Sequence, residues 1–158
     1  MCVEFYLITK KAGAKLGLLW KLILASVIML VTGYFGEIIQ PESSVLWGVL
    51  SGLAYFYIVY LVWAGEVAEL AKNAGENVQK AVKILAWFVL VGWAIYPLGY
   101  ILGTPGGLFN IDGTGTNNLA ADVIAYRHKL MDVIYNIGDA VNKIGFGLVI
   151  YALTQKEK

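Results

Sequence analysis

The chain has 158 residues, of which 59% are hydrophobic, 13% aromatic and 15% charged, with a formal net charge of +1. Apolar residues gathered into long runs indicate an integral membrane protein and exclude an ordinary soluble domain. Basic residues are scattered between these runs, so we expect no nucleic-acid partner. One cysteine, Cys2, excludes an internal disulfide and a cysteine-built metal site, and we expect no metal.

Apolar segments taken in chain order predict an all-α transmembrane fold with a single membrane domain over 1–158. Residues 1–10 are too short to cross a bilayer, and we expect them to be the end of a longer helix. Four complete transmembrane helices are expected over 16–39, 45–68, 78–102 and 127–154. Each is long enough to cross about 30 Å of hydrocarbon. A stretch rich in Gly, Thr and Asn predicts a loop over 103–121.

Lysines set the expected orientation. They lie on alternate connections and in the C-terminal tail, whereas the other connections are acidic or neutral. The positive-inside rule therefore places the C-terminus in the cytoplasm and the loop over 103–121 outside.

The last span carries Lys143 near its centre, where a charged amine costs several kcal/mol unless it is paired or neutralised. Asp139 lies four residues earlier, on the same helix face. A neutral lysine can attack a carbonyl carbon to form a Schiff base, whose protonated form needs a countercharge such as Asp139. A salt bridge that only fixes packing is the alternative, and both stay open on these residues alone.

Aromatic residues in the preceding span bear on this choice. Trp93, Tyr96 and Tyr100 recur at spacings of three and four, and Pro97 bends the helix at the same level. Such a stripe alone is more often ordinary packing than a cofactor site. Beside a lysine in the membrane, flat rings suit a long conjugated hydrocarbon.

Two motifs in these spans resemble the sixth and seventh helices of microbial rhodopsins. They are Trp93-Ala94-Ile95-Tyr96-Pro97-Leu98-Gly99-Tyr100, and Asp139-Ala140-Val141-Asn142-Lys143 followed by Gly145-Phe146-Gly147. Similarity to proteorhodopsin and xanthorhodopsin-like proton pumps adds Glu4-Phe5-Tyr6-Leu7, Tyr34-Phe35-Gly36-Glu37, Trp63-Ala64-Gly65-Glu66 and Tyr135-Asn136. The resemblance covers almost the whole chain. It implies a helical bundle of the seven-helix rhodopsin type, here four complete helices and the end of another.

The resemblance also implies a site. All-trans retinal is expected on Lys143 as a Schiff base, with Asp139 as counterion and Glu4 as the acid that returns a proton from the cytoplasmic side. An acid in an apolar helix holds its proton more readily, which agrees with that role. A residue at the membrane interface on a frayed helix end is the alternative for Glu4. The residues expected to line the chromophore are Met29, Gly33, Ser51, Tyr55, Trp93, Tyr96, Pro97, Tyr100 and Asn142.

Gly48 matches a position where xanthorhodopsin-like pumps have a glycine that opens the pocket to a carotenoid antenna. Close helix packing is the alternative for this glycine. The family's primary proton acceptor would precede Met1. We therefore expect the chain to be the C-terminal portion of a rhodopsin that needs the N-terminal helices for full activity and forms homo-oligomers at full length.

The leading functional hypothesis is a light-driven outward proton pump in the plasma membrane of a microbe, not an enzyme. A photosensory rhodopsin or a pump for another ion would share Lys143 and the aromatic residues, although a sensor needs no fast proton return from Glu4. The alternative of another class is a membrane scaffold or transporter fragment without retinal, in which Asp139 and Lys143 form a structural pair.

Overall fold

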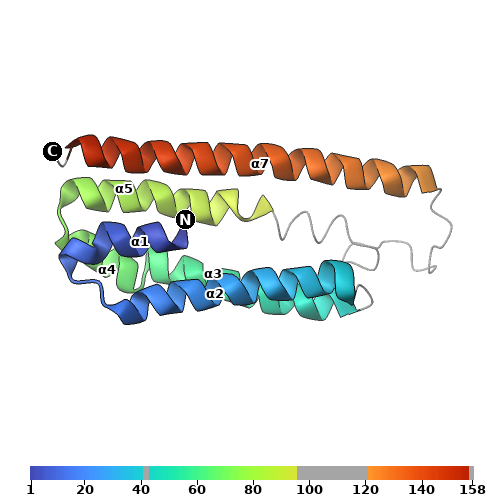
Figure 1. Ribbon diagram of the computed structural model, residues 1–158, viewed down its shortest axis with the longest axis horizontal. Helices are drawn as coiled ribbons and strands as arrows, with labels where there is room; N and C mark the ends of the chain where they lie inside the picture. Colours follow the sequence, from blue (N-terminus) through green and yellow to red (C-terminus); the bar gives the residue numbers. More distant parts are fainter. Residues whose placement is uncertain (41–42, 96–120, 157–158) are drawn as a thin grey trace.

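The structure, a computed structural model, describes residues 1–40, 43–95 and 121–156, with the backbone alone over 121–131 (Figure 1). All regular structure in these ranges is helical. The α-helices are α1 Cys2–Thr9, α2 Leu16–Tyr34, α3 Ser44–Trp63, α4 Glu66–Asn73, α5 Glu76–Trp87 and α7 Ala121–Lys156. A 3-10 turn, η1 Lys10–Ala12, follows α1, and π-helical segments, η2 Phe35–Ile39 and η4 Phe88–Gly92, continue α2 and α5.

Among the described residues, three helical stretches are long and apolar enough to cross a membrane: Leu16–Ile39, Ser44–Asn73 and Asp132–Lys156. In hydrocarbon every backbone N–H and C=O group needs a partner within the protein, and a continuous helix supplies one for almost all of them. Large apolar side chains, such as Leu30, cover the outer faces and are exposed. These faces suit contact with lipid chains.

Ala64 and Gly65 divide the single helix expected over 45–68. The backbone N–H groups of both residues donate to the carbonyl oxygen of Tyr60, at 2.9 and 2.8 Å. A Cβ atom at Gly65 would lie 2.9 Å from the Cα of Leu61, so the tight turn leaves no room for a side chain. The chain therefore leaves α3 and enters α4 across this turn.

The other expected spans fall on helices of the structure. Residues 1–10 correspond to α1 and the start of η1, 16–39 to α2 with η2, and 127–154 lie within α7. The helix expected over 78–102 is α5 followed by η4, and its residues from 96 onward lie outside the described residues. The loop expected over 103–121 also lies outside the described residues, except for Ala121, the first residue of α7.

The helices form a bundle in which α5 and α7 run side by side and α2 packs along α3 (Figure 1). The short helix α1 contacts α2, α4 and α5, and so lies between these two pairs. A buried core with side chains from α1, α2, α3, α4, α5 and α7 lies at the end of the bundle that contains α1. Its fully buried members include Phe5, Leu18, Leu22, Ile58, Val67, Leu85 and Val89.

Substitution of Leu22 by alanine tests this packing, with Leu24→Ala as the matched control on the same helix. Leu22 is fully buried, whereas Leu24 is 55% exposed. Lipid is as apolar as leucine, so most of the stability lost in Leu22→Ala comes from the cavity that the smaller side chain leaves. We expect this substitution to lower the free energy of unfolding by roughly 1–2 kcal/mol. Leu24→Ala should have less than half that effect. Unfolding in mixed micelles, followed by circular dichroism, measures both, and equal losses would contradict the packing described.

Candidate functional site

Lys143 and Asp139 form an ion pair across one turn of α7. The side chain of Lys143 is 68% exposed and that of Asp139 is 42% exposed. Asp139, Lys143 and Phe146 follow one another at spacings of four and three residues, so they form one stripe along the helix. The amine and carboxylate expected to form the centre of the site are therefore adjacent and accessible.

Helix α1 contacts this stripe at Phe146. The ring of Phe5 meets the ring of Phe146 edge-on, with centroids 5.7 Å apart and an interplanar angle of 84°. Glu4 precedes Phe5, and Lys143 lies one turn before Phe146. The carboxylate of Glu4 pairs with the α-amino group of Met1 and its side chain is 39% exposed. Glu4 and Lys143 thus belong to facing helices that meet at one aromatic contact.

Three of the residues expected to line the chromophore meet where α2 packs on α3. The hydroxyl of Ser51 donates to the backbone carbonyl of Met29 at 2.8 Å. A Cβ atom at Gly33 would lie 3.5 Å from the Oγ of Ser51, so Gly33 faces the same hydroxyl. The structure therefore brings Met29, Gly33 and Ser51 together, as one wall formed by two helices.

Tyr55 and Asn142 reach the π-helical segment η4 from two different helices. The hydroxyl of Tyr55, on α3, donates to the carbonyl of Leu90 at 2.6 Å. The side-chain amide of Asn142, on α7, donates to the carbonyl of Gly92 at 2.8 Å and is buried. A π-helix shifts the backbone pairing by one residue, and such segments are frequent at functional sites. These two donors hold η4 between α3 and α7.

Trp93 directly follows η4, is partly buried and packs against the core. Its backbone N–H donates to the carbonyl of Val89 at 3.3 Å. The position of this expected pocket residue therefore depends on the π-helical segment before it. Tyr55 and Asn142 were expected to line the chromophore, but their hydrogen bonds to the backbone of η4 were not expected.

Two glycines permit the close approach of α7 to this segment. A Cβ atom at Gly145 would lie 2.5 Å from the ring of Phe88, so any side chain there would displace the ring. A Cβ atom at Gly92 would collide with the amide of Asn142. Both glycines were visible in the sequence, but their partners on the neighbouring helix were not.

Gly48 lies on α3 and is partly exposed. The indole N–H of the preceding residue, Trp47, donates to the side-chain oxygen of Gln40 at 2.9 Å, and its ring packs on Phe35 with centroids 5.2 Å apart. Trp47 is thereby held toward the end of α2. The expected pocket residues Tyr96, Pro97 and Tyr100 lie outside the described residues.

The fold and the pair on α7 define a membrane helical bundle with an accessible lysine on its last helix. Residues 1–157 match the family model described as bacteriorhodopsin-like protein. The chain therefore belongs to the bacteriorhodopsin-like family.

Two relatives show how far the similarity extends. The green-light absorbing proteorhodopsin of Gamma-proteobacterium EBAC31A08 is 38% identical over 157 residues, which cover 98% of this chain and 55% of that protein. The blue-light absorbing proteorhodopsin of Gamma-proteobacterium Hot 75m4 is 35% identical, over 98% of this chain and 56% of that protein. The chain thus spans about half the length of the curated relatives it matches.

A solved structure agrees. The crystal structure of Exiguobacterium sibiricum rhodopsin superposes with a TM-score of 0.78 at 30% identity, covering 99% of this chain and 65% of that one. The predicted family and the all-α, rhodopsin-type membrane fold are thereby confirmed. Membership of this family implies a retinal chromophore.

The residues present fit such a group. An aldehyde needs an amine that it can reach, and the Lys143 side chain is mostly exposed. The protonated linkage needs a nearby anion, and Asp139 lies one turn away in direct contact. The roles of the individual residues stay predictions.

Tyr55→Phe removes a hydroxyl that donates to η4 without changing the ring. We expect it to lower the free energy of unfolding by about 1 kcal/mol, the usual contribution of one hydrogen bond. Tyr151→Phe, at a largely exposed tyrosine, is the matched control and should change stability little. Unfolding in mixed micelles measures the difference. Equal stability of Tyr55→Phe and the parent chain would contradict the role assigned to this hydroxyl.

Proposed function

We propose that this chain provides the retinal-attachment helix and the cytoplasmic proton donor of a light-driven outward proton pump. The observation that carries the proposal is the ion pair between Lys143 and Asp139, on the α7 stripe that contacts α1. Similarity to two proteorhodopsins supports the choice of a proton pump.

Retinal bound to Lys143 would supply light absorption and a change of shape that alters the proton affinity at the lysine nitrogen. Asp139 would stabilise the positive charge on that nitrogen, because its carboxylate lies one helical turn away on the same stripe. Tyr55 and Asn142 would hold η4, and with it Trp93, at the wall of the pocket. Met29, Gly33 and Ser51 would form the wall between α2 and α3.

Glu4 forms an ion pair with the Met1 amino group here, which favours its ionised form. Once released from that pair, Glu4 would hold a proton on the cytoplasmic side and give it to the lysine nitrogen after each cycle. Support comes from the position of Glu4 on α1. The residue that follows it, Phe5, contacts Phe146 on α7, the helix that carries Lys143. The partial exposure of the Glu4 side chain would let a new proton reach it from the cytoplasm. Directionality of transport follows if the outward route is closed when Glu4 donates.

The chain corresponds to about half the length of the proteorhodopsins it matches. We propose that the primary proton acceptor and the rest of the pocket come from N-terminal rhodopsin helices that assemble with this chain. In the plasma membrane of a microbe, the lysine-bearing loops and the C-terminus would face the cytoplasm. The assembled protein would form homo-oligomers.

A carotenoid antenna is a further part of this proposal. Gly48 has no side chain, is partly exposed, and lies one turn before Ser51 on α3. Trp47 is held away by Gln40 and Phe35. These features would leave room for a carotenoid beside the retinal ring.

Lys143→Ala should abolish the visible absorption band that forms when all-trans retinal is added to the chain co-expressed with the first helices of a related proteorhodopsin. Lys143→Arg is the matched control, since it keeps the positive charge beside Asp139 but has no nucleophilic amine. We expect neither variant to have the band. A visible band in either variant would show that retinal is not attached at Lys143.

Glu4→Gln should slow recovery after a flash by roughly 10²-fold, because an internal proton donor is lost. The proton would then come from solvent, so recovery should slow further as pH rises. Glu76→Gln, at an exposed surface pair with Lys80, is the control and should recover at the parent rate. Flash photolysis at several pH values measures both. Parent-like recovery in Glu4→Gln would assign the donor role elsewhere and favour a photosensor.

Gly48→Trp should block the proposed carotenoid contact while leaving the retinal band. With a carotenoid added to the retinal-bound assembly, excitation of the carotenoid should drive the photocycle in the parent and not in Gly48→Trp. Gly52→Ala, on the same helix with open space around it, is the control. Absence of energy transfer in the parent would remove the antenna from the proposal.

A further inference from the structure

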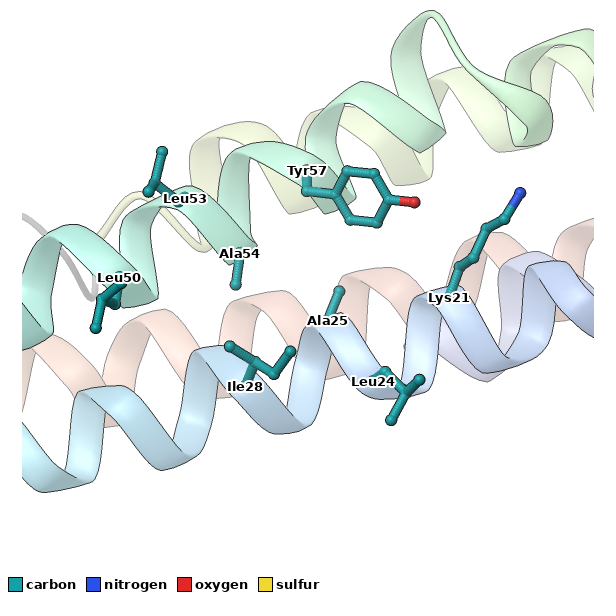
Figure 2. A pocket seen from close by; sticks show the side chains of 8 residues that line it. All are labelled: Lys21, Leu24, Ala25, Ile28, Leu50, Leu53, Ala54 and Tyr57. Atoms are coloured by element: carbon teal, nitrogen blue, oxygen red, sulfur yellow. The ribbon is translucent and has the colours of Figure 1, made fainter.

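A groove on the outer face of the bundle ends in polar groups. It runs between α2 and α3 and has a volume of about 410 Å³ (Figure 2). Ala25 and Ala54 point toward each other across it, and because both are small the two helices leave space at this level. Larger apolar side chains, among them Ile28 and Leu53, border it.

The amine of Lys21 and the hydroxyl of Tyr57 lie at one end of this groove (Figure 2). Lys21 donates to the carboxylate of Glu66 at 2.8 Å, and the Lys21 side chain remains 49% exposed. An ammonium group has three N–H donors, so this contact uses one of them. The Lys21 amine, which is charged, and the Tyr57 hydroxyl can therefore both donate hydrogen bonds at the end of an otherwise apolar groove.

Other lysines give the same end of the bundle a positive field. Lys10 and Lys11 lie in η1, and Lys15 is the N-cap of α2. Each basic residue near a membrane surface contributes about 1 kcal/mol of attraction for anionic lipid. A lysine this close to a helix end can extend its amine to the lipid headgroups while its methylene groups stay in hydrocarbon.

The length and direction of the groove suit one acyl chain. Ile28 is seven positions after Lys21, which corresponds to about 10 Å along the helix axis. One leaflet of hydrocarbon is about 15 Å deep, half of the roughly 30 Å bilayer core. The groove follows the helices, so an acyl chain lying along the bilayer normal fits it with the headgroup at the lysine.

We propose that this groove is a binding site for an anionic glycerophospholipid. Its phosphate is bound by the amine of Lys21 and the hydroxyl of Tyr57, and one acyl chain lies over Ala25 and Ala54. Glu66 competes with the phosphate for Lys21, so the carboxylate lowers the affinity of the site. This site is separate from Lys143 and does not depend on retinal.

Photo-cross-linking tests the proposal without retinal. The chain is placed in nanodiscs of phosphatidylglycerol and phosphatidylcholine in equal parts, with a trace of one lipid carrying a diazirine on its acyl chain. Peptide mass spectrometry then measures adducts on the groove segments of α2 and α3. We expect about fivefold more adduct from the phosphatidylglycerol probe than from the phosphatidylcholine probe. Equal yields from the two probes would overturn the proposal.

Four variants, each checked for helix content by circular dichroism, separate this site from general lipid contact. Lys21→Gln should equalise the two probes, whereas Glu66→Gln should raise the phosphatidylglycerol yield, because it removes the competing carboxylate. Ala54→Leu should lower the yield of both probes by filling the groove. Lys80→Gln, which removes a lysine from a comparable exposed pair with Glu76, should leave the preference unchanged. An unchanged preference in Lys21→Gln, or adducts formed mainly with a second copy of the chain, would contradict the proposal.

Discussion

A backbone carbonyl inside an apolar bundle must find a donor, and this requirement governs the centre of the structure. Where α5 passes into the π-helical segment η4, the carbonyls of Leu90 and Gly92 are bonded by the side chains of Tyr55 and Asn142. Loss of one of these side-chain hydrogen bonds would cost about 1 kcal/mol. The two side chains thus tie α3, η4 and α7 together, and set the position of Trp93.

The charged pair on α7 depends on the same contacts. Asn142 turns one face of α7 toward η4, and Gly145 lets the Phe88 ring pack closely on it. Once that face is fixed, helical geometry places Asp139 and Lys143 on the neighbouring stripe, whose Phe146 contacts α1. Two opposite charges one turn apart stabilise each other in a medium where either alone would be expensive. The positions of the charged groups therefore follow from contacts made by uncharged ones.

The spans expected over 16–39 and 127–154 lie on helices of the structure, and Asp139 pairs with Lys143, because these features follow from apolar length and a four-residue spacing. The turn at Ala64 and Gly65 was not predicted, because the helix expected over 45–68 runs through it and the contacts with Tyr60 and Leu61 are seen only in the folded chain. The π-helical segment was missed for a similar reason. Its donors come from other helices, and no local pattern distinguishes Tyr55 from an ordinary buried tyrosine.

Peptide mapping tests whether the Lys143 amine is the attachment point for retinal. The chain, assembled with N-terminal helices of a related proteorhodopsin and all-trans retinal, would be reduced with borohydride to make the linkage permanent. Mass spectrometry of its peptides would then locate the adduct. We expect the retinyl mass on Lys143 and on no other lysine of this chain. An adduct on another lysine, or none on this chain, would contradict it and leave Asp139 and Lys143 as a structural ion pair.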